Sequence, residues 1–177
     1  MDHKPRVIGL DLSLTSTGLA SSLGWTDRIK TKPDQYPTTF DRLRAIRASV
    51  LSAARSANLV VVEQLAISSQ TGQHLTRAGL WHLVMEAIDA ADVPWVAVTT
   101  QTLKKYATGK GNASKDETML AVARRFSEWE VSGNDEADAL VLAAMGADYL
   151  GHPIADMPKT HRDALDKVAW PELEVAR

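Results

Sequence analysis

Cysteine is absent from the 177-residue chain. The protein therefore has no disulfide framework, no thiolate zinc site and no cysteine nucleophile. Long apolar runs are absent too, because none approaches the roughly 20 residues that a membrane-spanning helix needs. The first residues also lack the apolar stretch of a signal peptide. We expect a cytoplasmic protein with no membrane partner, whose stability comes from an ordinary apolar core in one domain.

A strong charge of one sign is also missing, since the formal net charge is −2. This near-neutrality argues against general binding to nucleic acid, but the charges are unevenly distributed. Residues 28–55 carry seven Lys/Arg and two Asp/Glu, and residues 101–125 carry six and two. Residues 126–177 instead carry four basic and eleven acidic residues. Two basic segments in a neutral protein can form a binding surface for a polyanion, although each segment alone is more often a solvated surface.

The pattern of apolar residues predicts strands first and then alternating helices and strands, which indicates an α/β protein. The expected strands are 6–13, 18–25, 28–32, 59–66 and 93–98. The expected helices are 39–54, 75–91, 100–107, 115–127 and 135–150, with a short helix at 160–168 in an otherwise irregular tail. Ser114 and Glu117 have the spacing of a capping box, and Asn134 is the expected cap of the helix at 135–150.

Two acidic residues, Asp11 and Glu63, lie within apolar strands. A buried carboxylate is costly unless a partner or a metal compensates it. Asp135 and Asp138 are three residues apart and share one face of a helix's first turn. Each acid alone has a simple structural explanation, since strand ends meet solvent and acids in a first turn favour the helix dipole.

Together the four acids form a set of hard oxygen ligands that suits Mg²⁺ or Mn²⁺ and not zinc. Two such ions about 4 Å apart can activate a water and stabilise the leaving oxygen of a phosphodiester. The strand position of Asp11 is then explained by a rigidly held metal ligand whose burial cost the cation offsets.

Four motifs carry a family resemblance in the same order along the chain. They are GLDLSLTSTG with Asp11, VVVEQ with Glu63, LKKYATGKGNASKDETML, and NDEADALVLAA with Asp135 and Asp138. In this order they resemble the RuvC-type Holliday junction resolvases of the ribonuclease H-like superfamily. The third motif has one lysine before a Gly-x-Gly loop and another just after it. The resemblance covers about residues 6–150.

The resemblance implies a ribonuclease H-like α/β fold, with a mixed five-stranded sheet flanked by helices on both faces. It implies a nuclease domain over residues 1–151, followed by an irregular C-terminal tail at 152–177. The implied activity is Mg²⁺-dependent cleavage of Holliday junctions or other branched DNA in recombination, repair or phage DNA processing. Two metal ions are expected, with Mn²⁺ as the alternative to Mg²⁺.

The resemblance also assigns roles to individual residues. The metal-binding and catalytic acids are Asp11, Glu63, Asp135 and Asp138. Lys104 and Lys115 match the family's basic residues near the scissile phosphate and the DNA backbone, and Lys115 is assigned to catalysis as well. Lys105 and Lys110 are further DNA-binding candidates, for which a surface position is the alternative.

The chain departs from the RuvC pattern in one loop. RuvC proteins carry an aromatic residue soon after the active-site Glu, whereas residues 65–72 contain none. A looser branched-DNA nuclease, as in phage relatives, is therefore an alternative to a strict junction resolvase. A catalytically silent DNA-binding or scaffolding relative is a second alternative. An actin-like ATPase or sugar kinase fragment is a third, but those enzymes need a second duplicated domain.

A homodimer is the expected assembly, because a junction has two strands to cut. The helix at 75–91 is the candidate interface. Ala78 and Gly79 permit close approach, while Leu75, Trp81 and Leu83 offer apolar contact area. The alternative is that this face packs only on its own sheet.

Overall fold

The computed structural model describes residues 4–65 and 73–173. Its centre is a mixed five-stranded sheet with strand order β3-β2-β1-β4-β5. The strands are β1 (Val7–Asp11), β2 (Ser16–Ser21), β3 (Trp25–Lys30), β4 (Leu59–Glu63) and β5 (Trp95–Val98). β1, β2 and β3 pair antiparallel, whereas β1, β4 and β5 run parallel. The sheet therefore confirms the predicted fold class.

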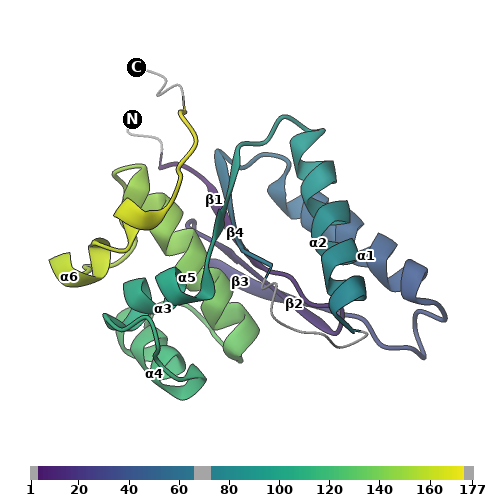
Figure 1. Cartoon of the computed structure of the whole chain (residues 1–177), viewed down its shortest axis with the longest axis horizontal. Helices are drawn as coiled ribbons and strands as arrows, with labels where there is room; N and C mark the ends of the chain where they lie inside the picture. Colours follow the sequence, from purple (N-terminus) through teal and green to yellow (C-terminus); the bar gives the residue numbers. More distant parts are fainter. Residues whose placement is uncertain (1–3, 66–72, 174–177) are drawn as a thin grey trace.

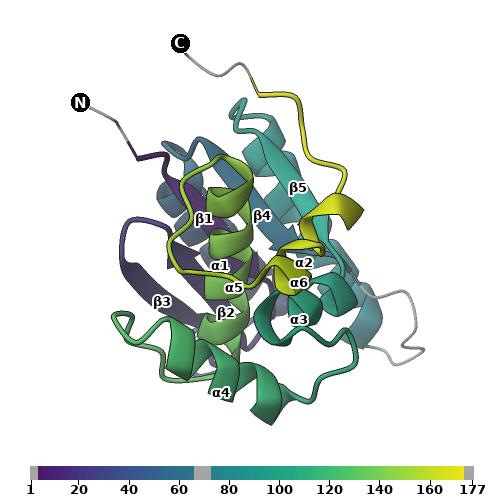
Figure 2. The same ribbon diagram turned by 90° about the vertical axis from the view of Figure 1, so that its left-hand side faces the viewer.

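Helices cover both faces of the sheet (Figures 1 and 2). One face carries α1 (Thr39–Ala54) and α2 (Gln73–Asp89). The other carries α5 (Asn134–Tyr149), with α3 (Thr100–Thr108) and α4 (Lys115–Arg125) packed beside it. A short helix α6 (Lys159–Arg162) and a 3-10 turn (Leu165–Lys167) follow. Among the described residues, no helix has the length and apolar character required to cross a membrane.

The parallel strands β1 and β4 are apolar almost throughout because each supplies both layers of the core. Along β4, Leu59 and Val61 pack towards α5, while Val60 and Val62 pack towards α1 and α2. All four side chains are fully buried. A strand buried on both faces reads as a continuous apolar run rather than an alternating one, as the sequence predicted.

Helix α5 lies directly on β1 and β2 because two glycines leave room for its backbone. A methyl group at Gly9 would stand 1.9 Å from the main-chain oxygen of Ala139. A methyl group at Gly18 would stand 2.0 Å from the main-chain oxygen of Asp135. Any other residue at these two positions would push the helix away from the sheet. The glycines thus fix the first turn of α5 against the strands.

Two local features differ from the sequence predictions. β2 ends at Ser21 and β3 begins at Trp25, earlier than predicted, because Gly24 adopts a φ of +100° in the turn between them. The N-cap of α5 is Gly133 and not Asn134, and no side chain caps it. In its place Glu136 reaches back and accepts a hydrogen bond from the Ser132 backbone N–H.

The C-terminal segment packs onto the core through residues 152–173. Met157 and Ala164 are buried in the same cluster as α5. Arg162 donates two hydrogen bonds, of 3.0 and 2.6 Å, to the buried carboxylate of Asp148. The Tyr106 hydroxyl donates a third, of 3.0 Å, to the same carboxylate. The predicted helix at 160–168 is thus divided into α6 and the 3-10 turn, and the domain boundary at 151 stays a prediction.

Candidate active site

A cleft of about 380 Å³ opens at the carboxyl ends of β1 and β4. Six of the residues singled out from the sequence line it together: Asp11, Glu63, Lys104, Lys115, Asp135 and Asp138. These residues come from five elements that are far apart in the chain. Their convergence into one cleft is the main structural support for a functional site here.

The two strand acids meet because their strands are parallel neighbours. Leu10 pairs with Val62 in the β1–β4 register, so Asp11 and Glu63 each follow one residue later. Both are the last residues of their strands. The carboxyl ends of parallel strands lie at the same edge of a sheet, which brings the two carboxylates close enough to repel each other.

Glu63 is held by two contacts that the sequence did not predict. The Thr100 hydroxyl donates a 2.5 Å hydrogen bond to Glu63 Oε1. The Trp81 indole N–H donates a 3.0 Å hydrogen bond to the Glu63 main-chain oxygen. The ring of Trp81 also packs edge-on against Trp95. Trp81 therefore supports the strand that carries Glu63, and it is half-buried. Its predicted part in a dimer contact stays a prediction.

The two helix acids are held by a buried ion pair beside them. Glu136 lies between them in the first turn of α5 and is only 5% exposed. Its carboxylate accepts a 2.9 Å contact from Arg28 Nε on β3. Together with the close approach at Gly18, this pair fixes the turn that presents Asp135 and Asp138 to the cleft. No local sequence pattern predicts such a long-range pair.

Electrostatics in the cleft disfavour full ionisation of the acids. Burial, followed by the negative charges of Glu63 and Asp138, raises the pKa of Asp11 to about 8. Burial and Glu63 raise the pKa of Asp138 to about 6, although Lys115 and Lys104 oppose this increase. Carboxylates that repel one another in a partly buried site gain stability when a cation joins them.

The residues fit a hard divalent cation in their chemistry. All four candidate ligands are carboxylates, and burial together with the negative charges of Glu63 and Asp138 raises the pKa of Asp11 above its ordinary value. Within the described part of the chain, however, no three His, Asp or Glu side chains stand close enough together to hold a metal ion as placed. The acids therefore line a shared cleft and do not form a closed cage.

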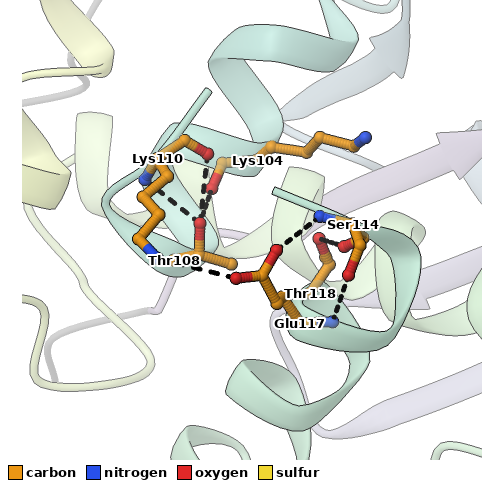
Figure 3. A network of polar contacts seen from close by, with 6 residues as sticks. All are labelled: Lys104, Thr108, Lys110, Ser114, Glu117 and Thr118. Carbon is orange, nitrogen blue, oxygen red and sulfur yellow. Dashed lines mark hydrogen bonds and ion pairs between the residues drawn. The ribbon is translucent and has the colours of Figure 1, made fainter. Parts of the chain in front are cut away.

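A network of polar contacts holds the turn between α3 and α4, the two helices that carry the cleft lysines (Figure 3). The Thr108 hydroxyl donates to the main-chain oxygens of Lys104 and Lys110, at 2.8 and 3.1 Å. Ser114 and Glu117 form the predicted capping box, which places Lys115 as the first residue of α4. In Figure 3 the Lys104 side chain extends away from this network.

The other two predicted DNA-binding lysines do not line the cleft. Lys110 forms an ion pair of 3.6 Å with Glu117 across the turn, and both side chains are largely exposed. Lys105 is half-buried on α3. Their contribution to DNA binding stays a prediction.

Several residues that line the cleft were not predicted as site residues from the sequence. They are Ser13, Arg77, Thr100, Thr118, Met119, Asn134 and Ala137. Thr100 follows directly after the cap of α3, where hydroxyl residues are common for structural reasons, so its type carries no functional signal. Arg77 is one of many arginines, and only the fold shows that α2 brings it to the cleft.

The mixed five-stranded sheet with helices on both faces defines an α/β protein, and comparison with known proteins shows which proteins share this fold. No family model matches the chain. The crossover junction endodeoxyribonuclease RuvC of Erythrobacter litoralis (strain HTCC2594) is 26% identical over 149 residues, covering 80% of this chain and 91% of that protein.

Solved structures show the same relationship. A structure of Thermus thermophilus RuvC matches with a TM-score of 0.67 at 24% identity, covering 86% of this chain and 99% of that one. The T. thermophilus RuvC complex with a Holliday junction substrate matches with a TM-score of 0.65 at 23% identity, covering 87% and 99%. The chain is thus RuvC-like in sequence and fold, which confirms the resemblance inferred from its motifs.

Proposed function

We propose that this protein is a metal-dependent endonuclease that cleaves Holliday junctions or other branched DNA. The observation that carries the proposal is the convergence of Asp11, Glu63, Asp135 and Asp138 with Lys104 and Lys115 in one cleft. The similarity to RuvC over 80% of the chain supports it. The enzyme would act in recombination, repair or phage DNA processing, in the cytoplasm of a bacterium or a phage-infected cell.

The four carboxylates are the proposed ligands of two Mg²⁺ ions, with Mn²⁺ as a possible substitute. When bound, such ions lower the pKa of a coordinated water and stabilise the leaving oxygen of a phosphodiester. Burial, followed by repulsion from Glu63 and Asp138, raises the pKa of Asp11 to about 8, and this supports the assignment.

The remaining cleft residues position the substrate and the acids. Lys115 is placed at the start of α4, where a helix N-terminus also favours an anion, so it is suited to bind the scissile phosphate. Lys104 contributes a second positive charge from α3. Thr100 directs the Glu63 carboxylate by donating to its Oε1 atom.

Branched DNA is the proposed partner, and the two basic segments contribute unequally. Segment 101–125 supplies Lys104 and Lys115 to the cleft, and we propose Lys105 and Lys110 as outer contacts of the backbone. In segment 28–55, by contrast, Arg28 and Arg47 form ion pairs with Glu136 and Glu86. These arginines are used within the protein, so the DNA surface centres on α3 and α4.

We also propose that the protein acts as a homodimer through α2. Leu75 is 77% exposed, and a methyl group added at Gly79 would meet no atom within 4 Å. This exposed face supports the predicted interface. Light scattering at micromolar concentration should give about twice the 19.3 kDa chain mass, and Gly79→Glu should yield a monomer. A wild-type monomer that makes paired, symmetric cuts would contradict the dimer.

A Mg²⁺-dependent nicking assay on four-way junctions, forks, flaps and linear duplex tests the activity. Glu63→Gln and Asp138→Asn should each abolish cleavage while leaving DNA binding intact or tighter, because each change removes a metal ligand and one negative charge. Asp135→Asn should be milder, since an acid at a helix start also serves the helix. Near-normal turnover in both Glu63→Gln and Asp138→Asn would refute the two-metal assignment.

The same substrate panel separates a strict resolvase from a looser nuclease. Cleavage confined to four-way junctions would identify a resolvase, and equal cleavage of forks and flaps would identify a general branched-DNA nuclease. The loop without an aromatic residue, on which this distinction depended in the sequence, lies mostly outside the described residues. Binding without cleavage in any metal would indicate the silent relative.

A further inference from the structure

Three cations line the cleft, and they come from helices on opposite faces of the sheet. Lys104 and Lys115 lie on α3 and α4, beside α5. Arg77 lies on α2, which covers the other face together with α1 (Figure 1). The acids at the ends of β1 and β4 therefore stand between a pair of lysines and a single arginine.

The Arg77 guanidinium is exposed, and among the described residues it has no hydrogen bond or ion pair. Three other arginines of the chain form ion pairs within the protein. Arg28, Arg47 and Arg162 contact carboxylates at 2.9, 3.5 and 2.6 Å. An arginine that lines an acidic cleft without joining any of its carboxylates is available for an external anion.

Arg77 also differs from the lysines in its effect on the pKa values of the acids. Lys115 and Lys104 are the groups that lower the pKa of Asp138. Arg77 is not among the principal groups that act on Asp11 or Asp138. The lysines therefore offset part of the negative charge of the acidic cluster, whereas Arg77 has no comparable effect on these two acids.

We propose that Arg77 binds a backbone phosphate of the DNA strand held in the cleft, next to the phosphate held by Lys104 and Lys115. The planar guanidinium presents paired N–H donors that match two phosphate oxygens, which a lysine cannot do. The strand is then anchored on both sides of the acids. This inference rests on the proposed function, because it assumes that nucleic acid enters this cleft.

The test is a binding measurement that does not depend on cleavage. Affinity for a fluorescent four-way junction is measured by anisotropy in Ca²⁺ across a range of salt concentrations. Arg77→Gln should weaken binding about tenfold at low salt and reduce the slope of log K against log salt by about 0.9, the value for one phosphate contact. Arg77→Lys should restore the slope, since it keeps the charge, but only part of the affinity.

Arg55→Gln is the matched control. Arg55 is exposed and lies just before β4, at the end of that strand away from the cleft. It should leave both affinity and slope unchanged. Urea unfolding of each variant checks that the fold is retained, and Arg77→Lys provides a second folded variant if Arg77→Gln is unstable.

The outcomes separate this inference from the function on which it rests. If wild-type protein binds with a steep salt dependence and Arg77→Gln keeps the full slope, the role of Arg77 is refuted and the nuclease proposal stands. A loss of turnover at saturating DNA, with affinity unchanged, would also refute it. If wild-type protein shows neither salt-dependent binding nor cleavage, the proposed function itself fails.

Discussion

Replacing Asp11 by asparagine should stabilise the metal-free protein at pH 8. The carboxyl has a pKa of about 8 in the folded protein, against 3.8 as its ordinary value. The folded state therefore holds a proton that the unfolded state has released. Stability is fully present below about pH 4 and is lost as the pH rises towards 8. Asparagine imitates the protonated carboxyl and can donate a hydrogen bond to Glu63, so the variant avoids this loss.

The magnitude follows from the two pKa values. At about 1.4 kcal/mol for each pKa unit, the difference sets an upper limit of about 6 kcal/mol at pH 8. Water and buffer cations in the open cleft screen part of the repulsion, so we expect the variant to be more stable by about 2 to 4 kcal/mol. The advantage should shrink steadily towards pH 4, where wild-type Asp11 is protonated in both states.

Urea unfolding in EDTA at several pH values measures this difference. Asp116→Asn, an exposed acid in the first turn of α4, is the control and should change stability by only a few tenths of a kcal/mol. Added Mg²⁺ at pH 8 should stabilise wild-type protein but have little effect on Asp11→Asn. An asparagine variant that is less stable than wild type at pH 8 would refute the reasoning, as would wild-type stability that does not change between pH 5 and pH 8.

Three further changes test how the cleft is held together. Thr100→Val should lower Mg²⁺ affinity 10- to 100-fold, measured by calorimetry, because it removes the hydrogen-bond donor to Glu63. Thr100→Ser keeps the hydroxyl and should restore the affinity. Equal Mg²⁺ affinity in the two variants would contradict this role of Thr100. Gly18→Ala should cost about 1 to 3 kcal/mol in chemical unfolding, because the added methyl meets the α5 backbone. Gly111→Ala, whose added methyl meets no atom closer than 3.4 Å, is the control and should change stability by less than about 1 kcal/mol. Glu136→Gln should reduce stability by about 3 kcal/mol or more, since it leaves the partly buried Arg28 without its charge partner, and a loss below about 1 kcal/mol would show that the pair is dispensable.

Much of the candidate acidic site could be predicted from the sequence because its residues stand out from their immediate neighbours in the chain. Asp11 and Glu63 interrupt apolar strands, where an acid needs an explanation. The capping box at Ser114 also identified the helix start that carries Lys115. These features depend on neighbouring residues in the sequence, and the structure places all of them where the pattern indicated.

The rest of the site depends on long-range contacts that no short pattern reveals. Thr100 and Trp81 reach Glu63 only because β5 and α2 pack beside β4. Arg28 reaches Glu136 across more than a hundred residues of chain. The predicted cap at Asn134 was wrong for the same reason, since the end of α5 is secured by Glu136 and by its contact with β2 instead of by a local side chain.

The C-terminal segment connects α3 and α5, the two helices that line the cleft on one side of the acids. Arg162 of this segment donates a hydrogen bond to the Asp148 carboxylate on α5. The same carboxylate accepts a hydrogen bond from the Tyr106 hydroxyl on α3. His161 contacts the Tyr106 main-chain oxygen at 2.9 Å. The helix that presents Lys104 and the helix that presents the acids are thereby tied together at a distance from the chemistry. Shortening the protein to residue 151 would leave a buried carboxylate without its cation and free these two helices to separate.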